Sequence, residues 1–286
     1  MPASMVLHVK PTDHCPATKV DGGIAITSLG KILYKYMKDM QVPAPEQLIK
    51  NYTFSPLYLG ERSPRVFNID TKKGTLCWFR LSSLEEQVSS SLFNHLYQDI
   101  ITNQIPTIKS KNMDFEVVRA IATPSSKHPW VNAVSLDSLI SENNKDDDEA
   151  LIDFVSSTLF VDNNTFMPLP IPKLVYENLG ASWNRIVPQH RIDESIISEI
   201  ANNVVIVLFK NLCTSIQSVS SETLRVGFVG KVRFRLISKD PQLLRYFNLL
   251  SDIAFYVGLG KDTNMGCGMV RRIPRSKWAL QRDLLK

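Results

Sequence analysis

The sequence predicts an α+β protein built from two tandem β-α-β-β-α-β units. Three observations predict this class: stretches with helical spacing alternate with short β-rich stretches, the order of elements in the first half of the chain recurs in the second, and a polar segment separates the halves. A chain of 286 residues that is 44% hydrophobic is long enough for two domains of ordinary size, each with its own core.

The first half, residues 1–123, reads as one complete unit. Apolar residues recur every three or four positions in residues 24–40 and 83–100 and predict two helices. Ser83 and Glu86 have the spacing of a capping box at the start of the second helix. Strands are predicted from β-branched and aromatic residues at positions 5–9, 51–54, 75–81 and 115–122.

A polar segment, residues 124–150, follows this unit and is predicted to be a linker. It contains clustered prolines and serines, a short helical pattern at residues 136–140, and the polar run SENNKDDDE at residues 141–149. We expect this run to form an acidic surface loop.

The second half, residues 151–286, repeats the order of the first. Helical spacing appears at residues 171–186, where Pro172 suits a first helical position, and at residues 241–256. Strands are predicted at residues 152–160, 204–209, 226–236 and 269–273. Two β-α-β-β-α-β units in one chain predict two ferredoxin-like domains in tandem.

Composition limits the cellular setting. The chain opens without a signal-peptide pattern, and its longest strongly apolar block is too short to cross a bilayer. The four cysteines stand far apart without a Cys-x-x-Cys pair, which predicts neither a zinc site nor a disulfide framework. We therefore expect a soluble cytoplasmic protein, without membrane attachment, metal site or cofactor.

Basic charge is concentrated near the C-terminus. Residues 224–286 contain 13 Lys and Arg against 4 Asp and Glu, a balance of +9, whereas the whole chain carries +5 and residues 1–223 therefore carry −4. This asymmetry favours a polyanionic partner, because Lys and Arg that neutralise phosphates release condensed counterions. A solvated basic face is the alternative interpretation.

A glycine-rich loop lies inside this basic region. The stretch YVGLGKDTNMGCGMV, residues 256–270, crowds four glycines between a predicted helix and a predicted strand. Its spacing does not fit a Walker A loop or a dinucleotide fingerprint. Without side chains, backbone amides can approach a phosphate closely, and a tightly turned loop is the structural alternative. Our candidate RNA contacts here are Gly258, Gly260, Lys261, Gly266 and Gly268.

Arginines on the flanking strands extend the predicted basic surface. Arg233 and Arg235 alternate with apolar residues, so both side chains should project from one face of a strand. Arg271 and Arg272 follow the glycine-rich loop and are added to the candidate RNA contacts. Trp278 is assigned either to base stacking or to covering the core.

These blocks resemble one known family. The stretch GFVG at residues 227–230, the helix at 241–256, the loop at 258–268 and the strand after it are similar to the C-terminal half of the CRISPR repeat-processing endoribonucleases, in the RAMP superfamily. Blocks that include FSPL at 54–57 and FRL at 79–81 match further upstream, in the same order. The resemblance covers nearly the whole chain and implies the same pair of ferredoxin-like domains.

The resemblance implies a metal-independent cleavage of CRISPR repeat RNA into guide RNAs. In this reaction a ribose 2′-hydroxyl attacks the adjacent phosphate and leaves a 2′,3′-cyclic phosphate and a 5′-hydroxyl. Such chemistry needs an acid or base, an aligned 2′-oxygen and a cation that stabilises the transition state.

The catalytic residues are less well defined, because many relatives carry a histidine in or just after the first helix and residues 23–51 contain none. His14, in the loop before the helix, is the first candidate for an acid or base. Lys31, Tyr34 and Lys50 are the candidates for a cationic or phenolic site. Surface or half-buried structural roles are the alternative for all four.

Two other functions remain open at this point. One is a catalytically inert RNA-binding subunit that holds the guide RNA repeat hairpin in a CRISPR effector complex, beside other subunits. The other is a pair of ferredoxin-like domains unrelated to RNA, for which RNA binding would show no salt dependence.

Overall fold

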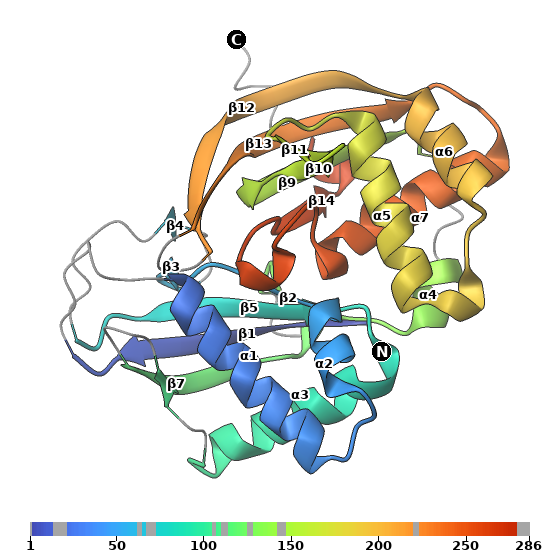
Figure 1. Cartoon of the computed structure of the whole chain (residues 1–286). Helices are drawn as coiled ribbons and strands as arrows, with labels where there is room; N and C mark the ends of the chain where they lie inside the picture. The colour runs from blue at the N-terminus through green and yellow to red at the C-terminus, as the bar shows by residue number, and fades with distance from the viewer. Residues whose placement is uncertain are drawn as a thin grey trace. The chain divides into compact units, whose positions relative to one another are not determined.

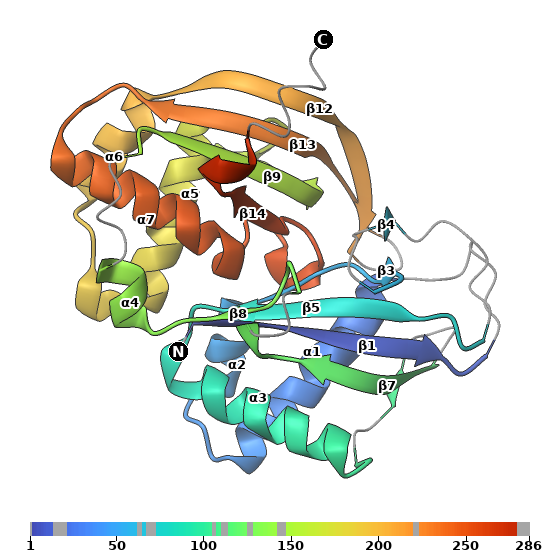
Figure 2. The same cartoon turned by 180° about the vertical axis from the view of Figure 1, so that it is seen from behind.

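A computed structural model gives the structure of the chain (Figures 1 and 2). It describes residues 2–13, 22–61, 65–66, 73–104, 107–109, 114–124, 128–141, 147–219 and 223–278. The chain divides into two compact units. Unit 1 comprises Met1–Leu136, Gln217–Arg225 and Asp262–Cys267, and unit 2 comprises Asp137–Ile216, Val226–Lys261 and Gly268–Lys286.

Unit 1 is built on an antiparallel sheet. Its strands follow the spatial order β4-β3-β5-β1-β7-β6, with β2 also paired to β5 and β8 to β1. The bounds of these strands are β1 Ala3–Pro11, β2 Tyr52–Phe54, β3 Tyr58–Leu59, β4 Arg65–Val66, β5 Cys77–Ser83, β6 Ile108–Lys109, β7 Asp114–Ile121 and β8 Asn132–Ala133. The central strand β1 pairs with β5 on one side and β7 on the other.

Two helices, α1 (Gly22–Asp39) and α3 (Glu86–Ile101), pack on one face of this sheet (Figure 1). Alternate residues of β1 point toward them and form the core with apolar residues of both helices. The core members from these elements are Met5, Leu7, Val9, Leu33, Met37, Leu92 and Leu96. A short helix, α2 (Pro45–Leu48), and a 3₁₀ turn, η2 (Ile49–Asn51), connect α1 to β2.

The capping box expected at Ser83 is wrong. Ser83 ends β5, and its hydroxyl accepts the backbone N–H of Glu85 at 2.9 Å. Helix α3 begins one residue later, at Glu86, with Glu85 as a cap that makes no side-chain hydrogen bond to the helix. The hydroxyl therefore bends the chain between strand and helix instead of capping the helix.

Unit 2 contains a second antiparallel sheet, with the spatial order β12-β13-β9-β14. The strands are β9 (Glu149–Thr158), β12 (Val204–Ser218), β13 (Leu224–Leu236) and β14 (Val270–Ile273). β13 and β14 both pair antiparallel with β9, the central strand. A small hairpin of β10 (Phe160–Asp162) and β11 (Thr165–Met167) follows β9.

Helices α5 (Pro172–Ile186), α6 (Glu194–Asn203) and α7 (Pro241–Val257) lie on one side of this sheet, as Figures 1 and 2 both show. The core between sheet and helices contains stacked aromatic rings, among them Tyr176 and Phe247 with centroids 5.2 Å apart. At the start of α7 the Asp240 carboxylate accepts the N–H groups of Gln242 and Leu243.

The predicted α+β fold is confirmed. In each unit the four main strands follow the order second, third, first, fourth, with the helices on one face, which is the ferredoxin-like arrangement. Helix α4 (Leu136–Ser141) lies in the segment expected to be a linker. Within the described part of the chain, no helix is both long and apolar enough to span a membrane.

Candidate nucleic-acid interface

The face of the unit 2 sheet opposite the helices carries the predicted arginine surface. On β13 the apolar residues Val232 and Phe234 are buried toward the helices, so the residues between them point to the open face. The register places Lys231 beside Asp153 and Arg235 beside Glu149, both on β9. Basic and acidic side chains therefore alternate across two neighbouring strands.

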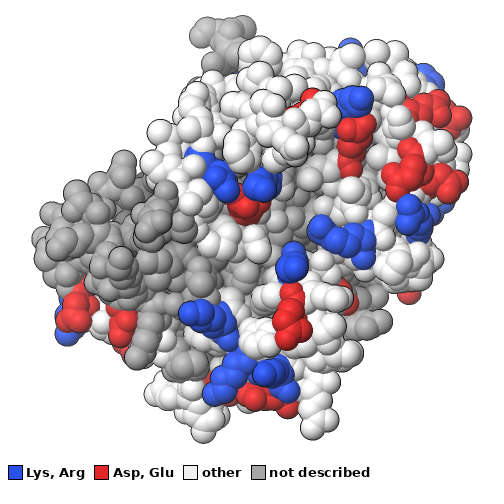
Figure 3. Space-filling model, viewed as in Figure 1, with Lys and Arg blue, Asp and Glu red and all other residues white. Residues whose placement is uncertain are grey.

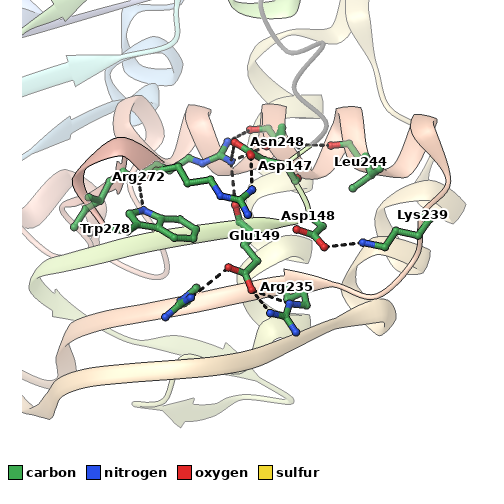
Figure 4. A network of polar contacts seen from close by, with 12 residues as sticks. Asp147, Asp148, Glu149, Arg235, Lys239, Leu244, Asn248, Arg272 and Trp278 are labelled. Carbon is green, nitrogen blue, oxygen red and sulfur yellow. Dashed lines mark hydrogen bonds and ion pairs between the residues drawn. The ribbon is translucent and has the colours of Figure 1, made fainter. Parts of the chain in front are cut away.

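Glu149 holds two of the predicted arginines, Arg233 and Arg235, and Figure 4 labels its contact with Arg235. Arg235 Nε donates to Glu149 Oε1 at 2.8 Å, and a second nitrogen of the same guanidinium contacts that oxygen. Arg233 Nη1 lies 3.4 Å from Glu149 Oε2. The carboxylate is nearly buried, with 6% of its side chain exposed, while Arg235 is 49% exposed. One face of the Arg235 guanidinium therefore remains accessible to an anion.

Arg271 has a similar arrangement on β14. Its Nε and Nη2 lie 3.3 and 3.2 Å from Asp153 Oδ2, and 31% of its side chain is exposed. Among the described residues of this face, four cations stand against two carboxylates, so the surface is positive. They are Lys231, Arg233, Arg235 and Arg271, with Glu149 and Asp153.

Arg272 lies on the opposite face of the sheet from these four cations. It lies opposite Ile152 in the register, on the side of the sheet that faces helix α7. Its guanidinium donates to Asn248 Oδ1 at 2.6 Å and to Asp252 Oδ1 at 3.1 Å, and only 11% of its side chain is exposed (Figure 4). The structure assigns Arg272 to joining β14 and α7 instead of presenting a charge to RNA.

Trp278 packs against two arginines after β14. The guanidinium carbons of Arg233 and Arg275 lie 5.2 and 5.6 Å from its ring centroid, within the range of cation–π contacts. The indole N–H donates to the Ile273 carbonyl at 2.9 Å. Arg275 also contacts Asp147 at 2.7 Å, which raises the pKa of the guanidinium.

The glycines of the 258–268 loop are explained by packing within the protein. The amides of Gly258, Gly260 and Gly268 donate to Ala254 O, Asn178 Oδ1 and Ser157 O respectively. All three glycines have positive φ, which most residues avoid. The expectation that these three amides face a phosphate is therefore wrong in this structure, because each already has an acceptor in the protein.

Two of these glycines also touch backbone directly. A Cβ on Gly260 would lie 2.2 Å from the Leu159 carbonyl oxygen, and one on Gly268 would lie 2.0 Å from that of Leu259. Gly266 has a positive φ of 91° at the end of the turn η5 (Thr263–Met265). The side chain of Lys261, by contrast, is exposed.

Three of the four predicted catalytic residues are described by the structure, and His14 lies outside the described residues. Lys31 is exposed on α1, and Lys50 is exposed in η2. Tyr34, one turn after Lys31 on α1, donates its hydroxyl to Glu46 Oε1 at 2.7 Å. This hydrogen bond raises the pKa of the Tyr34 phenol and lowers the pKa of the Glu46 carboxyl.

Sequence reasoning missed a wider basic stripe on α1. Lys31, Lys35 and Lys38 are all exposed and follow the spacing i, i+4, i+7, which places them on one side of the helix. Basic side chains gather over α1 in the view of Figure 3. Lys38 Nζ lies 5.7 Å from the Tyr34 ring centroid. The helical spacing of the three lysines was visible in the sequence.

The other histidines have structural positions. His8 and His128 are buried, and the Nε2 atom of each contacts the Glu61 carbonyl, at 3.1 and 2.9 Å. His95 contacts the Ser91 carbonyl one turn earlier on α3. The His190 carbonyl accepts the Trp183 indole N–H at 2.7 Å.

A cavity of about 630 Å³ in unit 1 is not suited to RNA. It lies between α1 and α3 and is lined by Tyr36, Asp39, Met40, Val42, Ser91, His95 and Asp99. Its charged residues are acidic, and the Tyr36 hydroxyl donates to Asp99 at 2.6 Å. Among the described residues there is no group of three or more His, Cys, Asp or Glu side chains arranged to hold a metal ion.

Two family models match the chain, one in each half. Residues 152–270 match "CRISPR-associated endoribonuclease Cas6", and residues 1–141 match "CRISPR Cas6 N-terminal domain". No protein of curated function matches the chain at a significant level.

Solved structures show the same fold. The chain is similar to the structure titled "Cas6 (TTHB231) product complex", with a TM-score of 0.76 and 17% identity over 96% of this chain and 100% of that one. "Cas6 (TTHA0078) product complex" gives a TM-score of 0.70 and 20% identity, over 96% and 99% of the two chains. "Thermus thermophilus Cas6 (TTHB231)" gives 0.69 and 19%, over 96% and 98%. Because the two family models together match most of the residues, the chain belongs to the Cas6 family of CRISPR-associated endoribonucleases.

Proposed function

We propose that the chain is a metal-independent endoribonuclease that cuts CRISPR repeat transcripts into guide RNAs. Membership in the Cas6 family carries this proposal. Similar structures whose titles name product and substrate-mimic complexes support an RNA partner for this chain as well. The 2′-hydroxyl of a repeat ribose attacks the adjacent phosphorus, the bond to the 5′-oxygen breaks, and a 2′,3′-cyclic phosphate remains.

The residues on and around α1 are proposed to supply the chemistry. His14 takes the proton of the 2′-hydroxyl, and the cationic side chains of Lys31 and Lys50 stabilise the charge that develops on the phosphate. Tyr34 gives a proton to the leaving 5′-oxygen. Its hydrogen bond to Glu46 holds the hydroxyl in a fixed position, and a phenol is protonated and able to donate at neutral pH.

RNA binding is proposed for a set of basic residues of unit 2 that are exposed or partly exposed. Lys231, Arg233, Arg235 and Arg271 on the open sheet face bind the sugar-phosphate backbone, and the exposed Lys261 contributes from the glycine-rich loop. Glu149 and Asp153 fix the arginine side chains in place, which lowers the entropy lost on binding. The glycines serve this interface indirectly, because they let the loop fold tightly beneath Lys261.

A single-turnover assay on an end-labelled repeat RNA tests this function. We expect cleavage to persist in EDTA and to fail when the nucleotide 5′ to the scissile phosphate is 2′-deoxy. Substitutions His14→Ala, Lys31→Ala, Tyr34→Phe and Lys50→Ala should each slow cleavage by about 10²-fold or more, while Lys10→Ala, an exposed lysine on β1, should not. Loss of cleavage in EDTA would contradict the mechanism.

The second candidate is an inert RNA-binding subunit that retains the guide RNA repeat hairpin in an effector complex. The absence of histidine from residues 23–51 favours it. The same assay separates the two functions, because an inert subunit would bind the repeat RNA in a salt-dependent manner and leave it uncut.

A further inference from the structure

A second, smaller cavity lies in unit 2 beside the glycine-rich loop. It has a volume of about 230 Å³ and is lined by Phe160, Val161, Leu174, Glu177, Asn178, Gly260 and Lys261. This volume is several times the roughly 30 Å³ that one water molecule occupies in the liquid, so a planar heterocycle can enter. Phe160, Val161 and Leu174 form the apolar part of the wall, and Glu177, Asn178 and Lys261 form the polar part.

The polar side presents one acceptor group and one donor group. Asn178 lines the cavity and its Oδ1 accepts the Gly260 N–H at 3.0 Å, a contact that does not use its two Nδ2 donors. Glu177 is the neighbouring residue on α5, and 41% of its side chain is exposed. Its carboxylate lies 3.9 Å from Lys173 Nζ, too far for a hydrogen bond, so both oxygens remain able to accept from a ligand.

An exposed aromatic ring stands next to the cavity. In the β10–β11 hairpin Phe166 pairs directly with Val161, and opposite residues of an antiparallel pair project from the same face. Val161 lines the cavity, and Phe166 is 50% exposed. A base that enters the cavity can therefore stack on this ring, while the exposed ammonium of Lys261 lies at the cavity wall for the attached phosphate.

We propose that this cavity binds one guanine base of the repeat RNA. This inference rests on the proposed function. Among the four bases, guanine alone offers two adjacent donors, N1–H and the N2 amino group, that match the two oxygens of a carboxylate such as Glu177. Its O6 accepts from the Asn178 amide. Adenine, cytosine and uracil each lack one of these features, so the cavity selects the nucleotide as well as holding it.

Replacement of single guanosines by inosine tests the proposal, because inosine lacks only the N2 amino group. The probe is the repeat RNA of the cleavage assay, with a 2′-deoxynucleotide at the cut site so that binding is measured without cleavage. Inosine at one guanosine position should weaken binding to the wild-type protein about tenfold. In Glu177→Gln guanosine and inosine at that position should bind alike, whereas Glu199→Gln, an exposed acid on α6, should keep the tenfold difference.

Two further variants separate stacking from base recognition. Phe166→Ala should weaken binding of the guanosine and inosine RNAs equally, by about tenfold, because every base has a face that stacks. Asn178→Asp keeps the oxygen that accepts from the Gly260 amide but replaces the Nδ2 donor with a second oxygen. We therefore expect weaker guanosine binding and an unfolding temperature close to that of the wild type.

The outcomes are distinct from those that test the catalytic function. If the protein cuts the repeat RNA but no guanosine position depends on Glu177, the guanine site is overturned and the endoribonuclease function stands. If the repeat RNA is neither bound nor cut, the proposed function fails and the guanine site fails with it.

Discussion

Single glycines decide the shape of the 258–268 loop. Their crowding in the sequence correctly marked an unusual backbone, but the sequence does not contain the distances that explain it. Gly268 needs its positive φ and its missing Cβ because the carbonyl of Leu259, nine residues earlier, lies against it. A ligand and a protein carbonyl impose the same requirement on a glycine, so composition alone does not separate them.

Gly268→Ala should therefore destabilise the protein. The added Cβ meets a backbone oxygen at 2.0 Å and the residue must also hold a φ of +68°, so we expect a loss of about 2–3 kcal/mol in the free energy of unfolding. The control is Gly30→Ala on α1, where nothing lies within 4 Å of the new Cβ; it should stabilise by about 0.5–1 kcal/mol. Urea unfolding measures both, and equal effects would contradict the packing explanation.

His8 should make the stability depend on pH. Burial lowers its pKa below the usual 6.5, so the folded protein binds a proton less readily than the unfolded chain does. Stability is then fully present above about pH 6.5 and falls as the pH decreases below it, with a slope of up to about 1.4 kcal/mol per pH unit. His8→Gln keeps a donor for the Glu61 carbonyl and should flatten the decrease measured between pH 7.5 and 5. An unchanged slope would show that other groups are responsible.

Side-chain direction could be predicted, whereas side-chain partners could not. The alternation around Arg233 and Arg235 correctly placed both on one face of a strand. Their shared partner, Glu149, is more than 80 residues earlier in the chain and sits where the acidic loop was expected to end. Arg271 and Arg272 are neighbours in the sequence and point to opposite faces, so the basic pair could not be assigned to RNA as a unit.

At the level of elements, helices and core strands can be predicted from the periodicity of apolar residues, because each element buries one of its faces and that burial imposes the periodicity. The predicted helix at residues 241–256 matches α7 within one residue. Helix α6 was missed although Ile197, Ile200 and Ala201 carry helical spacing after Asp193. The predicted strand at residues 204–209 is only the first part of β12, which continues to Ser218. None of its later residues whose burial is described is buried, so pairing with β13, not burial, extends the strand.

The contact between β14 and α7 should be far more sensitive to mutation than the surface ion pairs. Arg272→Ala removes the partner of Asp252 and Asn248 in a region where the arginine is only 11% exposed, and we expect a loss of about 2–4 kcal/mol in the free energy of unfolding. Lys239→Ala removes a cation that is 74% exposed from Asp148 and should cost less than about 1 kcal/mol.

Thermal or urea unfolding distinguishes these two variants. Both substitutions remove one cation from unit 2, so a difference between them reports burial and not net charge. If Lys239→Ala proved as costly as Arg272→Ala, the network drawn in Figure 4 would not be the element that fixes β14 to α7.

For the whole molecule, charge distribution is more informative than total charge. The net charge of +5 hides a C-terminal segment of +9, and the structure shows that part of this excess is paired with Asp147, Asp148, Glu149 and Asp153, which lie outside that segment. Cations without full internal compensation remain on the open face of the unit 2 sheet and at Lys261. These, and not every basic residue of the segment, set the electrostatic contribution to RNA binding.

Five proposed phosphate contacts predict a specific salt dependence of repeat RNA binding. They are Lys231, Arg233, Arg235, Lys261 and Arg271. Each phosphate contact releases counterions and contributes about −0.7 to −0.9 to the slope of log K against log salt concentration. Five contacts therefore predict a slope of about −4. Lys261→Gln should reduce its magnitude by about one. Arg191→Gln, which removes a 60% exposed arginine next to α6 on the helix side of the sheet, should leave it unchanged. Filter binding at KCl concentrations from about 50 to about 400 mM measures all three slopes. A slope near zero for the wild type would contradict phosphate binding by this surface, and equal slopes for the two variants would place the RNA away from Lys261.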